Sequence, residues 1–361
     1  MILDHKGILV IGGTGSLGQV LVKRLLAGEW GEPRFVRVFS RDEAKQHRMR
    51  SEIAQSSDEE SGLLYRSIAG GDSPLQFVIG DVRDKDALKK ALVRVNVVFN
   101  AAALKQVPAC EYFPIEAAKT NVMGAATLVQ AVLETFPRPD AVVGISTDKA
   151  CKPVNVMGMT KALQERIYQK ANLEVPEVRF VCVRYGNVLA SRGSVVPLFH
   201  HQIAKGGPVT VTDNRMTRFF LTLDRAVDTV IEALAHGCHG ETWVPRVPSA
   251  KIVDLALTLI AELDPDVTIN MTEIRPGEKL HEELVSTEEA SRTVIVNSHY
   301  LAIRSVLPEV RKLSRYVGGN CFLDRPLSSE DHLVDGGALK VLLEENGLLE
   351  PAPGTAEEVL R

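Results

Sequence analysis

The sequence has few cysteines, and their spacing fits neither a metal centre nor a disulfide framework. The 361 residues include five cysteines, which lie far apart at Cys110, Cys151, Cys182, Cys238 and Cys321. Cysteine metal sites place their ligands at short, regular spacings, and disulfide-rich folds use even numbers of cysteines. We therefore expect ordinary thiols in a reducing compartment and no metal ion.

Long apolar runs and basic blocks are also missing. The first apolar run, Ile8–Ile11, is too short for a signal peptide, and no run reaches the roughly 18 apolar residues that would span a bilayer. The net charge is −4, so nucleic acid is not an expected partner. These absences predict a cytoplasmic protein without a membrane span.

A strand, a glycine-rich turn and a helix follow one another near the amino end. Ile8–Ile11 predicts a buried strand, and Val20–Leu26 has the pattern of a helix. Between them Gly12 permits a tight turn, Gly15 lets the backbone approach a pyrophosphate, and Gly18 lets the helix pack close to the sheet. The residues expected here to bind a dinucleotide are Gly12, Thr14, Gly15, Ser16, Leu17 and Gly18.

The end of the second predicted strand bears on the choice between NADP and NAD. Phe35–Phe39 leads to Ser40 and Arg41, with Lys45 just beyond. An NAD site would place an acidic side chain here to bind the ribose 2′-hydroxyl group. A hydroxyl and a guanidinium suit a 2′-phosphate better, because Arg can bind phosphate through two parallel hydrogen bonds. The sequence favours NADP over NAD, and a solvated loop is the alternative.

Two further strands, Leu75–Ile79 and Val97–Asn100, are expected to complete the cofactor-binding edge. The loop after the third strand would hold the adenine ring, and the alanines after the fourth leave room for the cofactor. Residues 46–73 predict a helix followed by a mobile polar insertion on the surface. The cofactor residues expected from these loops and the following helix are Asp81, Val82, Ala101, Ala102, Lys105 and Asn121.

Three polar side chains stand between a fifth strand and a helix. Ala141–Ile145 predicts a buried parallel strand, and a helix is expected over residues 155–171. Thr147, Asp148 and Lys149 lie between them, at the sheet edge where open α/β folds bind ligands. A surface ion pair of Asp148 with Lys149 is the alternative reading.

These side chains permit acid–base chemistry beside a nicotinamide cofactor. Asp148 can donate a proton, and Lys149 can act as a base if burial or cationic neighbours lower its pKa. Thr147 can donate or accept a hydrogen bond, and Lys161 can hold the nicotinamide ribose. With NADP, this set supports oxidation of a sugar at C4, loss of water across C5–C6, and return of the hydride to C6.

Beyond residue 190 the composition changes, and arginines appear on predicted loops. Scattered arginines after a nucleotide-binding fold predict segments that bind a diphosphate, although each one alone can be a surface charge. The expected substrate residues are Lys105, Asn187, Val195, Arg215, Arg218, Arg275 and Glu278. The expected architecture is a Rossmann-like, doubly wound α/β sheet over residues 1–190, mainly substrate-binding segments over 191–300, and a partly helical extension over 301–361.

Together these motifs resemble the extended short-chain dehydrogenase/reductase superfamily, and within it the inverting UDP-N-acetylglucosamine 4,6-dehydratases of bacterial polysaccharide biosynthesis. The resemblance runs from Gly7 to about Thr293, and its most specific segments are residues 39–43, 80–84, 102–108, 146–150, 215–219 and 275–280. It implies a UDP-sugar substrate and a homo-oligomer, either a dimer or a hexamer. Retaining relatives carry Glu where this chain has Lys149, so the resemblance also implies inversion at C5.

One position departs from the superfamily pattern. The family usually has Tyr-x-x-x-Lys, in which Tyr takes the proton from the substrate hydroxyl, whereas this chain has Met157 four residues before Lys161. A thioether cannot exchange that proton. A UDP-sugar 4-epimerase and a non-catalytic NADP-binding regulator therefore stand as alternatives to the dehydratase. An epimerase would leave the Asp148–Lys149 pair unexplained.

Overall fold

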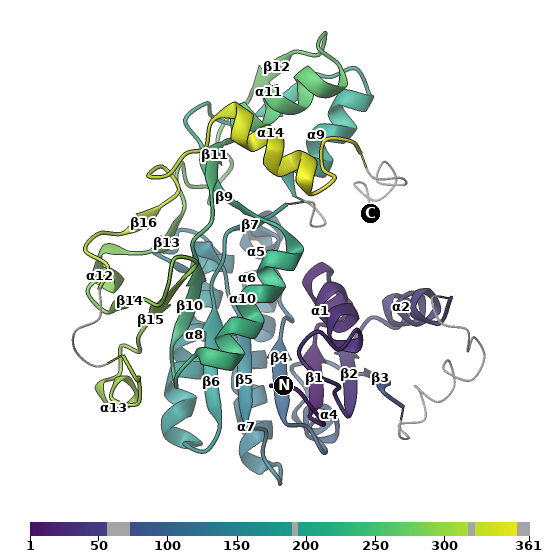
Figure 1. Ribbon diagram of the computed structural model, residues 1–361, viewed down its shortest axis with the longest axis vertical. Coiled ribbons are helices and arrows are strands. Elements are labelled where there is room, and N and C mark those ends of the chain that lie inside the picture. The colour runs from purple at the N-terminus through teal and green to yellow at the C-terminus, as the bar shows by residue number, and fades with distance from the viewer. Residues whose placement is uncertain (56–72, 190–193, 317–321, 352–361) are drawn as a thin grey trace.

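The computed structural model describes residues 1–55, 73–189, 194–316 and 322–351, and a nine-stranded sheet forms its centre (Figure 1). Across the sheet the strand order is β14-β15-β10-β6-β5-β4-β1-β2-β3. The strands are β1 (Gly7–Ile11), β2 (Phe35–Ser40), β3 (Leu75–Ile79), β4 (Val97–Asn100), β5 (Ala141–Ile145), β6 (Arg179–Val183), β10 (Thr242–Pro245), β14 (Thr293–Ile295) and β15 (Tyr300–Ile303).

The strands from β3 to β10 run parallel, and β15 and β14 add an antiparallel edge. Strands β1, β4 and β5 are buried at every residue, because helices cover both faces of the sheet. This explains their continuous apolar sequences. The prediction of a Rossmann-like, doubly wound sheet is confirmed.

Two helical layers cover the sheet. One core contains side chains of α1 (Ser16–Leu26), α2 (Glu43–Gln55) and α10 (Leu223–His236). The core on the opposite face contains side chains of α4 (Lys85–Ala91), α7 (Gly124–Glu134) and α8 (Val156–Glu174). Shorter elements connect them: α5 (Val107–Tyr112), α6 (Pro114–Ala117), a π-helical turn (Ala118–Met123) and a 3₁₀ turn (Asp148–Ala150). No helix in the described ranges is both long enough and apolar enough to cross a membrane.

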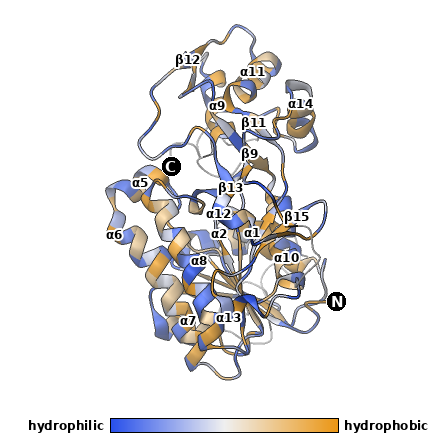
Figure 2. Cartoon of the chain, turned by 90° about the vertical axis from the view of Figure 1, so that its left-hand side faces the viewer, coloured by the Kyte–Doolittle hydropathy of each residue, from blue (hydrophilic) through white to orange (hydrophobic). Residues whose placement is uncertain are grey.

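A smaller body stands above the carboxyl edge of the sheet, and Figure 2 shows the narrow connection between the two. Its hydrophobic core contains side chains of α9 (Val195–Ala204), α11 (Ile252–Leu263) and α14 (Gly336–Glu345). Short strands complete it and join it to the large sheet: β7 (Asn187–Val188), β8 (Val209–Val211), β9 (Thr217–Leu221), β11 (Ser249–Lys251), β12 (Ile269–Met271), β13 (Glu283–Val285) and β16 (Leu327–Ser328). The part of the chain after β13 returns to the large sheet and is called the returning chain below. It contains two short helices, α12 (Thr287–Ala290) and α13 (Pro308–Arg311).

The chain crosses between the two bodies more than once. Strands β10, β14 and β15 all follow residue 190, yet they belong to the large sheet. The α14 helix, by contrast, packs in the smaller body although it lies near the carboxyl end. The division at residues 190 and 300 therefore stays a prediction about function. Most of the expected polar insertion, residues 56–72, lies outside the described residues.

A buried ion network ties the returning chain to the sheet. Arg184, which follows β6, is 2% exposed. Its Nη2 donates to Glu165 Oε2 of α8 at 2.6 Å, and its Nη1 donates to Glu289 Oε2 of α12 at 2.8 Å. Glu165 Oε1 also accepts from Ser146 Oγ at 2.5 Å, so the network reaches the residue before Thr147.

The network holds Glu289 ionised. Burial alone would raise the pKa of Glu289, but the guanidinium of Arg184 and, less strongly, that of Arg292 lower it to about 2. A carboxylate with a lowered folded-state pKa stabilises the protein above its ordinary pKa, and this stabilisation disappears as the pH falls through the folded value. The stabilisation is therefore present above a pH of about 4.5 and is lost towards a pH of about 2.

We expect Arg184→Met to lower the free energy of unfolding by about 3–5 kcal/mol at pH 7, because it leaves two buried carboxylates without their cation. Urea unfolding would measure the change. Arg246→Met, at an exposed position, is the matched control and should have little effect. Between pH 4.5 and 2 the variant should also lose stability less steeply than the wild type, and an equally steep loss would contradict the role of Glu289.

Candidate active site

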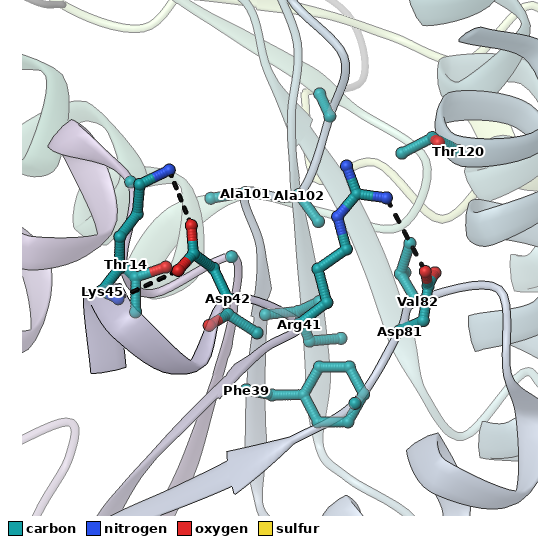
Figure 3. A pocket seen from close by; sticks show the side chains of 16 residues that line it. Thr14, Phe39, Arg41, Asp42, Lys45, Asp81, Val82, Ala101, Ala102 and Thr120 are labelled. Atoms are coloured by element: carbon teal, nitrogen blue, oxygen red, sulfur yellow. Dashed lines mark hydrogen bonds and ion pairs between the residues drawn. The ribbon is translucent and has the colours of Figure 1, made fainter. Parts of the chain in front are cut away.

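Two adjoining cavities follow the carboxyl edge of the sheet. The first, of about 270 Å³, lies over the glycine turn and the ends of β2 and β3 (Figure 3). The second, of about 580 Å³, runs from the same turn past the ends of β4, β5 and β6 to the loop at residues 275–278. The edge that the sequence predicts for ligand binding is therefore hollow along the length a dinucleotide would need.

The glycine turn has no space for larger side chains. Gly12 has a φ of +78°, and a Cβ placed there would lie 2.7 Å from the backbone nitrogen of Ala102. A Cβ on Gly18 would lie 2.6 Å from the Cα of Gly13. The amino end of α1 has no side-chain cap at Gly15 and borders the cavity. These features fit the pyrophosphate of a dinucleotide, which binds to backbone N–H groups at a helix amino terminus.

The first cavity offers both a cation and a carboxylate. The Arg41 side chain is 61% exposed, and its Nη1 lies 3.8 Å from Asp81 Oδ2. Lys45 Nζ lies 3.0 Å from Asp42 Oδ2, as Figure 3 shows. Asp42, the residue just before α2, also lines the cavity. Its hydrogen bonds with Lys45 lower its pKa, so it presents a carboxylate beside the Arg41 guanidinium.

Most of the predicted cofactor residues line these cavities, and one does not. Those that do are Gly12, Thr14, Gly15, Ser16, Leu17, Gly18, Ser40, Arg41, Lys45, Asp81, Val82, Ala101, Ala102, Lys105 and Lys161. Asn121 is 1% exposed and lines neither cavity. Its amide accepts from the N–H of Leu104 and donates to its carbonyl, both at 2.9 Å, and it also donates to Thr160 Oγ1 at 3.0 Å. Asn121 thus positions the neighbours of Lys105 and Lys161, and Thr120 lines the first cavity in its place.

The predicted catalytic residues meet at the second cavity, apart from Asp148. Thr147, Lys149, Met157 and Lys161 line it. Asp148 is fully buried behind the wall. Its Oδ1 accepts hydrogen bonds from Thr147 Oγ1 at 2.8 Å and from Lys149 Nζ at 3.0 Å.

The second carboxylate oxygen of Asp148 has no hydrogen-bond partner among the described residues. It lies behind Gly186, a residue of the cavity wall, and a Cβ there would be 3.5 Å from Asp148 Oδ2. The same Cβ would lie 2.6 Å from the Cβ of Phe219, so this position requires glycine. The glycine leaves the unpaired oxygen separated from the cavity by backbone alone.

The environment of Lys149 differs from the expected one. Burial lowers the pKa of its ammonium, but the carboxylates of Asp148 and Glu282 outweigh that effect, so the pKa is raised. Lys149 Nζ lies 3.3 Å from Glu282 Oε1 and donates to Asn187 Oδ1 at 3.2 Å. The condition set for Lys149 as a base, a lowered pKa, is therefore not met in the free protein.

Glu282 is a site residue that the sequence analysis missed. It is 2% exposed and lies two residues after the end of the Arg275–Leu280 motif. No local pattern distinguishes it from Glu283, its neighbour. Only the return of this loop across the end of β5 brings it to Lys149.

Lys161 and Met157 lie side by side on the first turns of α8. The Lys161 ammonium donates to the carbonyl of Ile145 and to Gln164 Oε1, the latter at 2.6 Å. Burial lowers its pKa to about 8. Met157 is 5% exposed and packs with Cys110 and Ala117. Its thioether therefore fills the wall where a phenol would be expected.

Tyr185 lines the same cavity and is a second residue that the sequence analysis did not single out. Burial raises the pKa of its hydroxyl, so the phenol is neutral. Its carbonyl accepts from the N–H of Asp148 at 3.0 Å. Tyr185 thus helps to fix the backbone of the catalytic segment.

The predicted substrate residues divide into two groups. Lys105, Asn187, Arg275 and Glu278 line the second cavity, and Val195, Arg215 and Arg218 do not. Arg215 is 67% exposed and pairs with Asp213 at 2.8 Å. Arg218 is 6% exposed and donates to the carbonyls of Lys279 at 3.0 Å and Leu280 at 3.1 Å. It shapes the loop that carries Glu282 and does not face the cavity.

The described part of the chain contains no candidate metal site, because no group of three or more of its His, Cys, Asp or Glu side chains is arranged to hold a metal ion.

The family model described as polysaccharide biosynthesis protein matches residues 8–304. The UDP-glucose 4-epimerase of Rickettsia conorii is 41% identical over 298 residues, which cover 82% of each chain. An uncharacterized membrane protein of Methanocaldococcus jannaschii is 43% identical over 293 residues, covering 79% of this chain and 81% of that protein. The X-ray structure of Pen from Bacillus thuringiensis is 31% identical, covers 96% of this chain and 100% of that chain, and has a TM-score of 0.84.

We expect Gly12→Ala to weaken binding of a nicotinamide dinucleotide by about tenfold or more, because the new Cβ would force apart the turn and Ala102. Quenching of intrinsic fluorescence on cofactor titration would measure this. Gly206→Ala is the matched control, since Gly206 has a φ of +80° but open space around it. Both variants should lose about 1 kcal/mol of stability from backbone strain, Gly12→Ala should lose more because of its clash with Ala102, and only Gly12→Ala should lose affinity. Equal affinities would contradict the assignment of the turn.

Proposed function

Because the chain belongs to the polysaccharide biosynthesis protein family, we propose that it is a nucleotide-sugar enzyme, and specifically a UDP-N-acetylglucosamine 4,6-dehydratase that inverts C5. The observation that carries the proposal is the buried Asp148–Lys149 pair, with Thr147 and Lys149 on the cavity wall. A 4,6-dehydratase needs an acid for the 6-hydroxyl and a base for the C5 hydrogen. This pair supplies both functions next to the proposed cofactor site.

The cofactor of this proposal is NADP. The glycine turn would hold the pyrophosphate, Arg41 the 2′-phosphate, and Lys161 the nicotinamide ribose. When bound, it would supply hydride transfer from C4 and return of the hydride to C6. Lys161 would add positive charge near the reacting carbon, which favours loss of the C4 hydroxyl proton.

In this proposal Thr147 takes over the proton transfer that Met157 cannot perform. Its Oγ1 already donates to Asp148 Oδ1 at 2.8 Å. Thr147 can accept the C4 hydroxyl proton while it passes its own proton to Asp148. Because Asp148 lies behind the wall, it returns this proton to Thr147 Oγ1, and the hydroxyl proton of Thr147 passes to the departing 6-hydroxyl, which leaves as water. Lys149, as the neutral amine, accepts the C5 hydrogen as a proton. Water then protonates the opposite face of C5, which inverts that carbon, and the hydroxide formed takes the proton from Lys149.

A UDP-sugar 4-epimerase is the second candidate, and the name of the Rickettsia relative favours it. An epimerase would use the same cofactor and the same C4 oxidation, without loss of water. The acid and base for C5 and C6 would then have no role. The homo-oligomer and the cytoplasmic location stay predictions.

The decisive experiment incubates the purified protein with UDP-N-acetylglucosamine in deuterated water and analyses the product by mass spectrometry and NMR. The dehydratase should give a nucleotide sugar lighter by one water, with deuterium at C5. A product of unchanged mass with altered configuration at C4 would establish the epimerase instead. Unchanged substrate across a panel of UDP-sugars, with cofactor bound, would support the non-catalytic regulator.

We expect Lys149→Met to reduce formation of the dehydrated product by about 100-fold or more, because the variant has no base for C5. Cofactor content, measured by absorbance after denaturation, should not change. Lys152→Met is the control, since Lys152 pairs with Glu283 and lies outside both cavities. A Lys149→Met protein with the full wild-type rate would refute the proposed role of Lys149.

Cofactor selectivity provides a separate test at Arg41. Arg41→Ala should weaken NADP binding by about tenfold or more and leave NAD affinity unchanged, because only NADP carries the 2′-phosphate. Calorimetric titration of both cofactors would measure the ratio. Arg34→Ala, at an exposed position just before the amino end of β2, should change neither affinity. A parallel loss of both cofactors in Arg41→Ala would contradict the choice of NADP.

A further inference from the structure

The cavity-facing ammonium of Lys149 is enclosed by charged groups from several elements. Its Nζ contacts Asp148 Oδ1 at 3.0 Å within its own turn, and Glu282 Oε1 at 3.3 Å from the loop before β13. Arg218 of β9 adds positive potential from nearby. Lys279 Nζ lies 3.9 Å from the other oxygen of Glu282. These groups give Lys149 two buried anionic partners, and Asp148 already supplies, through Thr147, the proton for the leaving group.

Glu282 is held in place by the chain beyond residue 304. Its N–H donates to Ser329 Oγ at 2.9 Å, and its carbonyl accepts from the N–H of Ser329 at 2.8 Å. Ser329 Oγ also lies 2.6 Å from Thr217 Oγ1 at the start of β9. The carboxyl-terminal segment, which the family match at residues 8–304 does not include, thus fixes the backbone of a residue that contacts Lys149.

Among the described residues, the carboxylate of Glu282 lacks a hydrogen-bond partner at one of its two oxygens. Its Oε2 is buried and accepts no hydrogen bond from any described residue. An ionised carboxylate is costly when one of its buried oxygens accepts no hydrogen bond, and protonation removes the charge. Burial raises the pKa of Glu282, and the nearby Asp148 carboxylate adds to that effect, against Lys149, Arg218 and Lys279. Glu282 is therefore suited to take up a proton inside the protein.

We propose that Glu282 is the positioning residue that sets the protonation of Lys149, by accepting one proton from its ammonium across the 3.3 Å contact. The N–H bond of Lys149 breaks, an O–H bond forms on Glu282, and the pair changes from ammonium and carboxylate to amine and carboxylic acid. The net charge of the buried pair stays at zero. Lys149 then presents the amine that removal of the C5 hydrogen requires.

This inference rests on the proposed dehydratase, and it explains how Lys149 can be a base although its carboxylate neighbours favour the ammonium. Because the proton stays within the pair, formation of the amine does not depend on the pH of the solvent. Without the carboxylate, Lys149 would have to release its proton to water. The rate would then rise with pH through the pKa of Lys149.

The test compares Glu282→Gln with Glu283→Gln, its neighbour in sequence, whose carboxylate pairs with Lys152. At pH 7 we expect Glu282→Gln to lower kcat by about tenfold or more, with KM nearly unchanged, and the loss should shrink as the pH rises towards 9. The wild type and Glu283→Gln should show no such rise. If the pH profiles of kcat for Glu282→Gln and the wild type coincide, or if Glu282→Gln loses kcat equally at every pH, the proposal is overturned.

A second readout does not depend on activity. NMR titration of ¹³C-labelled lysine, with the Lys149 signal assigned by its absence in Lys149→Arg, would follow Lys149 directly. Removal of the Glu282 carboxylate should lower the pKa of Lys149 while the ammonium still predominates at pH 7, and Glu283→Gln should leave the pKa unchanged. A lower pKa in Glu282→Gln together with an inactive wild type would refute the dehydratase alone. An active wild type with no change in either readout would refute the role of Glu282 alone.

Measurements of melting temperature and cofactor content would show whether each variant is correctly folded. If Glu282→Gln does not fold, Glu282→Asp keeps a carboxylate and shortens the side chain by one methylene. It should retain the flat pH profile of the wild type at a lower kcat, because a proton acceptor is still present. A profile for Glu282→Asp that rises with pH would contradict the proposal.

Discussion

The buried contact of Arg184 with Glu165 and Glu289 is the constraint on which the site depends. It joins the consecutive elements α8 and β6 to α12, and Glu289 of α12 lies 105 residues after Arg184. Such a network is costly to desolvate, and its energy is favourable only when every charge keeps its partner. It therefore demands one arrangement of the returning chain. That arrangement places the loop with Glu282 against the end of β5.

The electrostatics of the site follow from this placement. Lys149 would be a desolvated cation with a single carboxylate partner if Asp148 were alone. The returning loop adds Glu282, and the balance shifts towards the ammonium. Lys161, in the first turns of α8, donates hydrogen bonds to two neutral oxygens, and burial lowers its pKa to about 8. Two lysines at one cavity thus have opposite pKa shifts because of the groups that surround each of them.

The local parts of the fold and the site could be predicted from the sequence. Buried parallel strands read as continuous apolar runs, and the turn that contains Gly12 depends on a backbone conformation that glycine favours. These signals lie within a few residues, and so does the Thr147–Lys149 segment at the end of β5. The cofactor cavity was predicted for the same reason, because parallel strands bring their carboxyl ends to one edge.

The sequence by itself determined which segments become strands, where the glycine turn lies and which polar residues follow β5, because local periodicity and turn chemistry encode these features. Only the tertiary structure decided that Asn121 holds the loop at Leu104 by hydrogen bonds, that Arg218 does not line the cavity and that Glu282 contacts Lys149. Each of these outcomes depends on contacts between segments distant in the chain. The side chain of Glu282 has the same chemistry as that of Glu283, and burial against Lys149 is what gives it a different role.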